Sequence, residues 1–294
     1  EPCCHHGRTP PCTDALLEAG IARVVVGMED PNPLVRGRGL SRMAAAGVEG
    51  RTGVLEQTAR ALNPGFEKRM RGGLPYVRCK LAMSLDGRTA MASGESQWIT
   101  GAAARRDVQR LRARSSAVMT GVGTALGDDP SLTLRPAELG FEPHAQPLRV
   151  VVDSSLRLGP AAKLFQQPGP VLVACAEAEP ARAEALRQAG AEVVSLPAGD
   201  NGVDLPALHR HLADQHQVNE VLVEAGATLS GALLRASLID EVVVYMAAIV
   251  MGDAARGLFH LPGLGSLAEK HRLTIDDIRQ VGEDWRIIAK PLYH

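Results

Sequence analysis

The chain has 294 residues, of which 45% are hydrophobic and 22% are charged, and its formal net charge is −1. This composition is typical of globular proteins and excludes a disordered chain, and the balanced charge excludes a strong general attraction for nucleic acid or anionic lipid. The length exceeds one typical domain, so we expect two. No apolar run approaches the ~20 residues of a membrane span, and no signal peptide is recognisable, so we expect a cytoplasmic protein.

The first 73 residues alternate between helical and extended patterns. We predict helices at 13–19, 39–46 and 55–71, the last broken near Asn63-Pro64-Gly65, and a buried strand at 23–27. Arg71-Gly72-Gly73-Leu74-Pro75 carries the strongest boundary signal, so we predict domains at 1–73 and 74–294. The chain begins at Glu1 and not at Met, and we expect its natural N-terminus to lie upstream.

The residues after the boundary alternate between strands and helices. The two-residue periodicity of Val77, Cys79, Leu81 and Met83 predicts a strand at 76–84, and further strands are expected at 117–121, 149–153, 171–175, 192–196, 220–224 and 241–246. Helices are expected at 100–114, with Thr100 as its cap, and at 180–189, 205–215 and 228–236. This alternation predicts an α/β fold whose mainly parallel sheet is covered on both faces. Segments 272–275 and 285–290 lack an intervening helix and indicate an antiparallel end.

Three of the five cysteines lie in the first twelve positions, in Pro2-Cys3-Cys4-His5-His6-Gly7-Arg8-Thr9-Pro10-Pro11-Cys12. The glycine and prolines predict a turn that returns Cys12 to Cys3, and a helix that begins just after Cys12 favours thiolates. Thiolates bind Zn²⁺, so the pattern indicates a zinc site. Two buried free thiols, or a structural zinc completed by His5 or His6, are the alternatives. The number of cysteines is odd and they are unevenly distributed along the chain, which argues against a disulfide framework.

Two predicted strands lead into glycine-containing turns. Glu224-Ala225-Gly226 precedes one helix, and the other turn runs from Gly121 through Gly127 to Pro130. Such turns let backbone N–H groups approach a phosphate, although an ordinary loop is the alternative for each.

Several polar segments contain further candidate binding residues. Leu85-Asp86-Gly87-Arg88 and Ser96-Gln97-Trp98-Ile99-Thr100 place a lone Trp98 in a polar loop, either as a core anchor or as a ligand contact. Arg112 and Arg135 are either phosphate-binding or solvated surface residues. We interpret His209, His211 and His216 as one solvated helix face.

Seven segments in fixed order are far more specific than any one of them. They are Glu1-Pro-Cys-Cys-His-His-Gly-Arg-Thr-Pro-Pro-Cys12, Asp30-Pro-Asn-Pro33, Gly37-Arg-Gly39, Leu85-Asp-Gly-Arg88, Gly94-Glu-Ser-Gln-Trp-Ile-Thr100, Asp128-Asp-Pro130 and Val223-Glu-Ala-Gly226. Together they resemble the family of bifunctional riboflavin-biosynthesis proteins, in which a pyrimidine deaminase is fused to a pyrimidine reductase. The resemblance runs from Glu1 to about Lys290.

For the N-terminal part, the resemblance implies a cytidine-deaminase-like domain with one Zn²⁺ held by a His and two Cys, the latter matching Cys3 and Cys12. The family's His-x-Glu, whose Glu shuttles protons, would lie upstream of Glu1. These 294 residues are therefore expected to reduce their substrate without deaminating it. Arg8, Asp30 and Asn32 are candidate substrate contacts.

For the C-terminal part, the resemblance implies a dihydrofolate-reductase-like domain that uses NADPH to convert a ribosylamino into a ribitylamino side chain by hydride transfer to C1′. The implied NADP contacts are Ala82, Trp98, Thr124, Asp128, Ser154, Gly226, Ala227, Thr228, Leu229, Ser230, Gly231 and Ala232. The implied substrate contacts are Lys80, Ser96, Arg112, Leu132, Arg135 and Glu224. The shared edges of such reductase domains also lead us to expect a homodimer or a higher homo-oligomer. The alternatives are a folate-type reductase on the same fold and a zinc-bound interaction module without catalysis.

Overall fold

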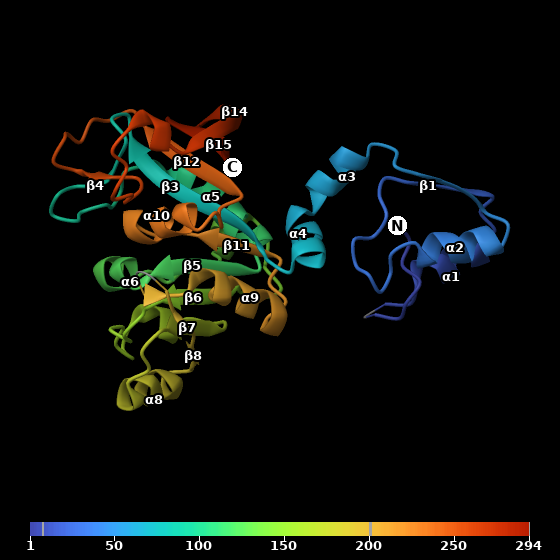
Figure 1. The fold of residues 1–294 in the computed structure, drawn as a ribbon, viewed down its shortest axis with the longest axis horizontal. Coiled ribbons are helices and arrows are strands. Elements are labelled where there is room, and N and C mark those ends of the chain that lie inside the picture. Colours follow the sequence, from blue (N-terminus) through green and yellow to red (C-terminus); the bar gives the residue numbers. More distant parts are fainter. Residues whose placement is uncertain (8, 200–201, 294) are drawn as a thin grey trace. The chain divides into compact units, whose positions relative to one another are not determined.

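A computed structural model of the chain describes residues 1–7, 9–199 and 202–293. The chain divides into two compact units, Glu1–Leu74 and Pro75–His294 (Figure 1). Within the described ranges, no helix is long and apolar enough to cross a membrane.

The first unit combines short helices with a small parallel sheet. α1 (Cys12–Glu18) contacts α2 (Arg38–Ala45), and β1 (Arg23–Val26) pairs with β2 (Glu49–Thr52). The prediction of a buried strand here is wrong, because β1 pairs with β2 alone among the described residues and Val25 remains 55% exposed.

Two helices end this unit. α3 (Glu56–Leu62) and α4 (Pro64–Gly72) are separated at Asn63, which confirms the predicted break. Pro64 begins the second helix, where its missing N–H and fixed φ are tolerated. Gly73 adopts a left-handed conformation after the last turn, and this helix end fits the glycine-rich boundary signal.

The second unit is built on a nine-stranded sheet. Its strands are β3 (Tyr76–Ser84), β5 (Ala117–Gly121), β6 (Leu148–Val152), β7 (Val171–Cys175), β8 (Ala191–Ser195), β11 (Glu220–Val223), β12 (Glu241–Ala247), β14 (Arg272–Val281) and β15 (Asp284–Leu292). They lie in the order β14-β15-β12-β3-β11-β5-β6-β7-β8. The pairs from β12 to β8 are parallel, whereas β15 is antiparallel to both of its neighbours. The predicted parallel sheet with an antiparallel end is confirmed.

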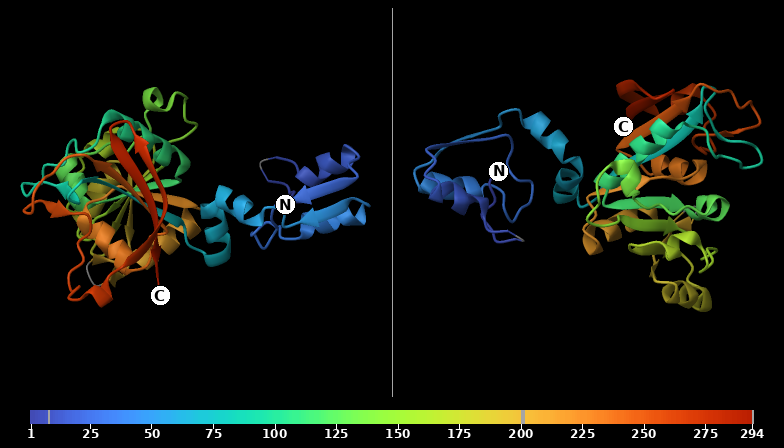
Figure 2. Two further views of the ribbon diagram at one scale, coloured as in Figure 1. Left: turned by 90° about the horizontal axis from the view of Figure 1, so that it is seen from above. Right: turned by 180° about the vertical axis from the view of Figure 1, so that it is seen from behind.

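Helices cover both faces of this sheet (Figure 2). α9 (Leu205–Gln215) and α10 (Ala227–Arg235) pack on the face that carries Val221 and Val223, and α5 (Ala102–Arg114) packs on the opposite face against Leu222. α8 (Pro180–Gln188) and α6 (Val122–Asp128) contribute to a third cluster around β7. Successive residues of a strand point to opposite faces of the sheet, so both faces are covered by helices. The ends of the strands are where a site can form.

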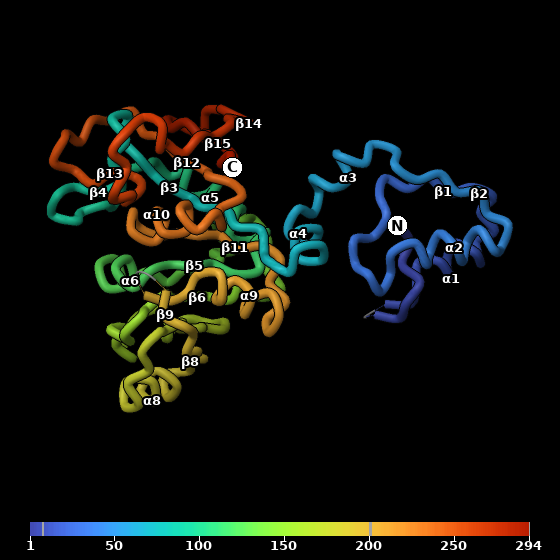
Figure 3. The backbone as a smooth tube through the Cα atoms, in the orientation of Figure 1, coloured from blue at the N-terminus to red at the C-terminus, as the bar shows by residue number. Residues whose placement is uncertain are grey.

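Short elements connect the larger ones. β4 (Arg88–Ala90) pairs with β13 (Arg256–Gly257) and so joins the chain after β3 to the chain after β12, as the tube in Figure 3 shows. β9 (Ala198–Gly199) pairs with β10 (Gly202–Val203), and α7 (Pro136–Leu139) is a single turn.

Two local predictions are wrong. Thr100 does not cap α5, because the N-cap is Gly101, whose N–H donates to the carboxylate of Asp284 at 2.8 Å. His209 is not on a solvated face, since its side chain is fully buried and its Nδ1 lies 2.7 Å from the carbonyl oxygen of Leu205.

Candidate active site

A cluster of charged side chains lies where β3 and β11 run side by side. Val223, the last residue of β11, pairs with Cys79, so Lys80 of β3 lies beside Glu224, which directly follows β11. Arg112, from the last turn of α5, donates from Nε and Nη2 to the two carboxylate oxygens of Glu224 at 2.5 and 3.0 Å. Such a two-pronged contact fixes the carboxylate in one orientation.

Burial and charge together set the protonation of this cluster. Burial raises the pKa of Glu224, but the guanidinium of Arg112 and the ammonium of Lys80 outweigh it and hold that pKa below its usual range. Burial, together with the charge of Arg112, lowers the pKa of Lys80 despite the opposing carboxylate of Glu224. The cluster therefore pairs a firmly ionised carboxylate with a lysine whose proton is held less tightly than usual.

Arg135 and Leu132 lie in the loop that approaches this cluster. The side chain of Arg135 is half exposed and forms an ion pair with Glu138 at 2.8 Å, and its positive charge contributes to the lowered pKa of Glu224. Leu132 adopts a left-handed φ of 53° with its side chain buried. Leu132 as a whole is only 3% exposed, so little of its surface is open to a ligand.

Two hydrogen bonds join segments that are distant in sequence beside this site. The N–H of Gly226 donates to the hydroxyl of Thr124 at 3.1 Å, and the hydroxyl of Ser96 donates to the carboxylate of Asp128 at 3.3 Å. Both glycine-containing turns and the polar loop predicted from the sequence therefore meet at one end of the sheet.

The residues of α10 divide between two environments. Gly226 and Thr228 are exposed and Ala227 is partly exposed, so the start of the helix is open to a ligand. Ser230 is fully buried, and a Cβ at Gly231 would lie 2.1 Å from the carbonyl oxygen of His260. Leu229 and Ala232 pack against the core. The side chains of residues 229–232 thus serve packing, and only the first turn faces outward.

The other predicted cofactor residues are more dispersed. Ala82 is half-buried on β3 opposite Tyr245. Ser154 follows β6, and a Cβ at Gly202 would come within 2.1 Å of its hydroxyl oxygen. Trp98 is 67% exposed, with the guanidinium of Arg105 4.8 Å from its ring centroid, so the interpretation as a core anchor is wrong.

Sequence reasoning assigned no role to Asp86. Its carboxylate accepts hydrogen bonds from the hydroxyl of Ser84 and from the N–H groups of Met251 and Gly252. The Ser84 bond is the largest influence, and together these bonds lower the pKa of Asp86 to about 2. Asp86 therefore ties the loop after β3 to the loop after β12, beside the candidate site.

Sequence reasoning also missed Arg78. Its guanidinium is buried in β3, 2.6 Å from the carboxylate of Glu220 in β11 and 2.7 Å from that of Glu241 in β12. The ring of Tyr76 stacks against the guanidinium, with its centroid 5.0 Å from the guanidinium carbon. This ion triad joins three neighbouring strands at the end opposite the candidate site, and its partners are more than 140 positions away in sequence.

In the first unit, Cys3 and Cys12 are brought together as predicted. Their sulfurs lie 3.3 Å apart, and the backbone N–H of Cys12 donates to the sulfur of Cys3 at 3.2 Å. That N–H and the Cys12 thiol lower the pKa of Cys3. Two sulfurs on one Zn²⁺ would be ~3.8 Å apart at ~2.3 Å each, so a small shift would suffice for shared coordination. Among the described side chains, no third ligand gathers with them.

The loop segments of this unit fold around Glu1. Its carboxylate accepts from the N–H groups of Asp30, Gly37 and Gly39 at 2.9–3.0 Å, and these bonds outweigh burial and lower the pKa of Glu1. Asp30 and Asn32 use their side chains to fold the local turn. Arg8 lies outside the described residues.

Comparisons with known proteins agree with this arrangement. The RibD C-terminal domain matches residues 75–287, which is most of the second unit. The riboflavin biosynthesis protein RibD of Escherichia coli K12 is 49% identical over 97% of this chain and 78% of its own length. This chain belongs to the RibD family.

Solved structures extend the likeness to the fold of both units. RibD of Acinetobacter baumannii, form 1, superposes with a TM-score of 0.89 at 42% identity, covering 100% of this chain and 79% of that one. A diaminohydroxyphosphoribosylaminopyrimidine deaminase/5-amino-6-(5-phosphoribosylamino)uracil reductase from Thermotoga maritima superposes with a TM-score of 0.83 at 29% identity, and the match covers 99% of this chain and 78% of that one. The resemblance inferred from the seven sequence segments is confirmed, and the chain is a riboflavin-biosynthesis enzyme that corresponds mainly to the reductase part of its relatives.

Proposed function

We propose that the Pro75–His294 unit uses NADPH to reduce 5-amino-6-(5-phosphoribosylamino)uracil to its ribitylamino product. One observation carries this proposal: the cluster of Lys80, Arg112 and Glu224 lies where the middle of β3 runs beside the carboxyl end of β11, inside the region that matches the RibD C-terminal domain. The substrate is the one named for the related protein of Thermotoga maritima.

The residues that we assign to NADPH fit a dinucleotide. A methyl group added at Gly123 or Gly127 would meet no atom within 4 Å, and Gly226 and Thr228 are exposed. Open backbone at a helix start suits a pyrophosphate, because the unpaired N–H groups and the helix dipole favour negative charge. Ala82, Trp98, Thr124, Asp128 and Ser154 complete the proposed contacts. When bound, NADPH supplies the hydride for C1′.

We assign the 2′-phosphate of NADPH to the neighbourhood of Ser154. This hydroxyl lies after β6, next to the backbone of Gly202. A phosphate adds about −1.5 to −2 charges that hydrogen-bond donors must meet, so NADPH should bind in preference to NADH.

The remaining charged residues fit the substrate. Opening of the ribosyl ring breaks the C1′–O4′ bond, a C–H bond forms at C1′, and O4′ takes up one proton. Lys80 is suited to supply that proton, because its lowered pKa makes it a better acid than an ordinary lysine. Glu224, held by Arg112, accepts a hydrogen bond from the pyrimidine or its amino group. Ser96 and the backbone of Leu132 complete the proposed contacts.

We assign the substrate phosphate primarily to Arg135. Its side chain is half exposed, whereas Arg112 already donates to Glu224 and to the carbonyl oxygen of Thr133. A charge-assisted bond to phosphate is worth about 1.5–3 kcal/mol, so Arg135→Ala should lower kcat/KM roughly 10- to 100-fold while leaving the Kd for NADPH unchanged. Arg187→Ala removes an arginine of α8 that has nearly the same exposure and a similar ion pair, with Glu184, and serves as the control. Equal kinetics for the two variants would remove Arg135 from the phosphate site.

For the Glu1–Leu74 unit, we propose membership of a zinc-dependent pyrimidine deaminase domain that binds one Zn²⁺. Cys3 and Cys12 supply two soft thiolate ligands of the kind that zinc takes. We derive no deamination step, because the described residues bring no third ligand to these sulfurs. We also propose a homodimer or a higher homo-oligomer, in keeping with the exposed Ile275 and Ile278 on the edge strand β14.

A further inference from the structure

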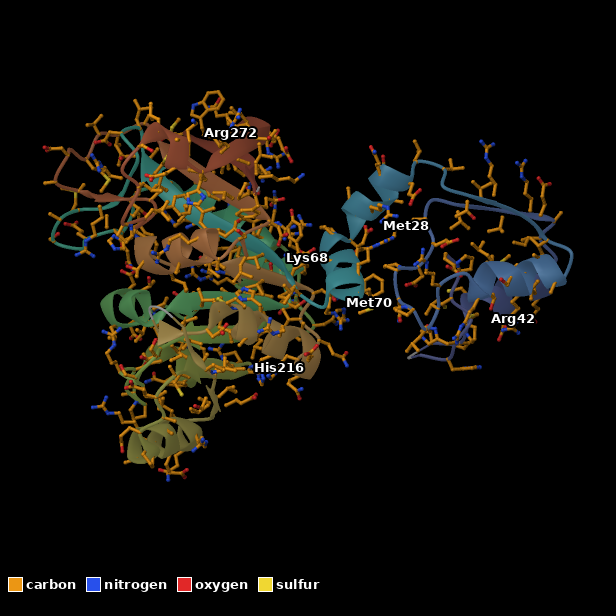
Figure 4. The ribbon with its side chains drawn as sticks, in the orientation of Figure 1. Met28, Arg42, Lys68, Met70, His216 and Arg272 are labelled. Atoms are coloured by element: carbon orange, nitrogen blue, oxygen red, sulfur yellow. The ribbon has the colours of Figure 1, made fainter. Side chains whose placement is uncertain are left out.

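A second cluster of ionisable side chains lies outside the candidate active site. Glu192 belongs to β8, the edge strand of the sheet, while His211 lies in α9 and His216 directly follows that helix, as Figure 4 shows for His216. The Nε2 atoms of His211 and His216 lie 3.9 and 3.4 Å from the two carboxylate oxygens of Glu192. Of the His, Cys, Asp and Glu side chains that the structure describes, these alone form a group of three with potential ligand atoms within 4.8 Å of one another.

These distances match the spacing of ligands around one metal ion. Nitrogen and oxygen ligands lie ~2.0–2.2 Å from Zn²⁺, and a tetrahedral arrangement places two such ligands ~3.4 Å apart. The observed separations of 3.4 and 3.9 Å are therefore close to those of a coordinated set. Both exceed the usual 2.7–3.2 Å range of an N–H···O hydrogen bond.

The histidine nitrogens that face Glu192 lack hydrogen bonds. Both Nε2 atoms are shielded from solvent and have no hydrogen-bond partner among the described residues. Shielded polar atoms without a partner are destabilising and are rare in folded proteins. The two side chains are only 21% and 23% exposed, so the interpretation of a solvated helix face is wrong for them as well. A cation between the three groups would satisfy both nitrogens and the carboxylate at once.

The position of the cluster separates it from the reductase chemistry. Glu192 is the second residue of β8, and His216 precedes β11, so the cluster lies toward the amino ends of the parallel strands. Lys80 and Glu224 belong to the site at the other end. A surface depression borders Glu192 and His216 and is also lined by Gln146. Water entering from it could supply a fourth ligand.

We propose that Glu192, His211 and His216 bind one divalent transition-metal ion of the zinc class. Two imidazoles and one carboxylate suit zinc, cobalt, nickel or copper, whereas magnesium and calcium prefer all-oxygen sites. The ion ties the edge strand β8 to the end of α9 and stabilises the second unit. This site is distinct from the proposed Cys3–Cys12 site and does not depend on the proposed reductase activity.

The test uses the full chain carrying Cys3→Ser and Cys12→Ser, which removes the thiolate pair of the first unit. After treatment with a chelator, Zn²⁺ binding is measured by calorimetry and metal content by mass spectrometry. We expect one Zn²⁺ per chain and no comparable binding of Mg²⁺. Cobalt should give the visible absorption of a four-coordinate ion without a thiolate charge-transfer band.

Single substitutions then locate the site. In the same background, His211→Ala or His216→Ala should weaken Zn²⁺ binding at least tenfold, and Glu192→Gln should weaken it without changing side-chain size. His144→Ala, at an exposed histidine outside the cluster, is the matched control and should leave binding unchanged. Zn²⁺ should raise the Tm of the background protein, reported by tryptophan fluorescence, but not that of Glu192→Gln.

Two results would overturn the proposal. One is the absence of Zn²⁺ binding in the Cys3→Ser/Cys12→Ser background. The other is Zn²⁺ binding of equal strength in the control and in the three cluster variants, which would place the ion elsewhere on the surface. Because the fold of Glu192→Gln can be checked by its fluorescence and Tm without metal, a folding failure is distinguishable from loss of the site.

Discussion

Replacing Arg112 by methionine should destabilise the second unit strongly. The change removes the two hydrogen bonds to Glu224 and one to the carbonyl oxygen of Thr133. The side chains of Arg112 and Glu224 are only 11% and 12% exposed, so the carboxylate would stay buried without its main counter-ion. Breaking such a pair costs about 3–5 kcal/mol, and because the nearby Lys80 offsets part of this, we expect a loss of about 3 kcal/mol in unfolding free energy.

Tryptophan fluorescence during urea unfolding measures this loss in the relevant unit alone. The chain has two tryptophans, Trp98 and Trp285, and both belong to Pro75–His294. The urea midpoint should fall by roughly 1 M, given a slope of ~2–3 kcal/mol per M for a unit of this size. Arg110→Met, at an exposed position of the same helix, should change the stability by less than ~0.5 kcal/mol.

Two further measurements sharpen this test. Arg112→Met combined with Glu224→Gln should recover part of the loss, because the buried carboxylate is removed and only the buried ammonium of Lys80 is left without its counter-ion. The folded pKa of Glu224 lies below the ordinary 4.5, so the ion pair stabilises the fold above that pH and its contribution disappears as the pH falls through the lowered value. The difference between wild type and Arg112→Met should therefore shrink in acid. A loss no larger than that of Arg110→Met near neutral pH would refute the buried ion pair.

Three other substitutions test separate parts of the second unit. Arg78→Leu removes the counter-ion that Glu220 and Glu241 share, leaving Glu220 with the more distant Arg114 and Glu241 with the hydroxyl of Tyr76, and should cost about 3 kcal/mol in the same urea assay; unchanged stability would contradict the triad. Gly231→Ala should lower the urea midpoint because its Cβ would meet the backbone of His260. Gly123→Ala, where the added methyl group meets open space, should not lower it. Equal effects of the two substitutions would argue against the close approach of Gly231 to His260. Asp86 has a pKa of about 2 against an ordinary 3.8, so its ionised carboxylate stabilises the fold fully above pH 3.8 and this stabilisation is lost toward pH 2. Asp86→Asn should therefore lower Tm at pH 6 but not at pH 2. An equal lowering of Tm at both pH values would contradict this pH dependence.

The strands of the second unit could be predicted closely because their sequences are continuous apolar runs between turn signals. The predicted bounds of β3, β5 and β7 agree with the structure at both ends, and those of the other parallel strands differ by a residue or so. The order of strands could not be predicted, because β3 pairs with β11 and β12, which follow more than 130 positions later. Local patterns contain no information about such pairing.

The candidate site was predictable residue by residue only through the family resemblance. The sequence signalled Arg112 as a candidate phosphate ligand, but its pairing with Glu224 joins residues 112 positions apart and requires the folded sheet. The same limit explains the errors. Trp98 is exposed although its size suggested a core position, and His209 is buried although it directly precedes Arg210 and His211. Each depends on which element packs against it.

Transfer of a labelled hydride from NADPH to C1′ is the most direct test of the proposed reductase activity. The chain is incubated with 5-amino-6-(5-phosphoribosylamino)uracil and NADPH deuterated at C4 of the nicotinamide, with either face labelled in separate reactions, and the product is examined by NMR and mass spectrometry. We expect one of the two labels to appear as a single deuterium at C1′ of a ribitylamino product, and we expect no reduction of dihydrofolate. Absence of deuterium at C1′ with both labels, or NADPH oxidation with dihydrofolate alone, would contradict it.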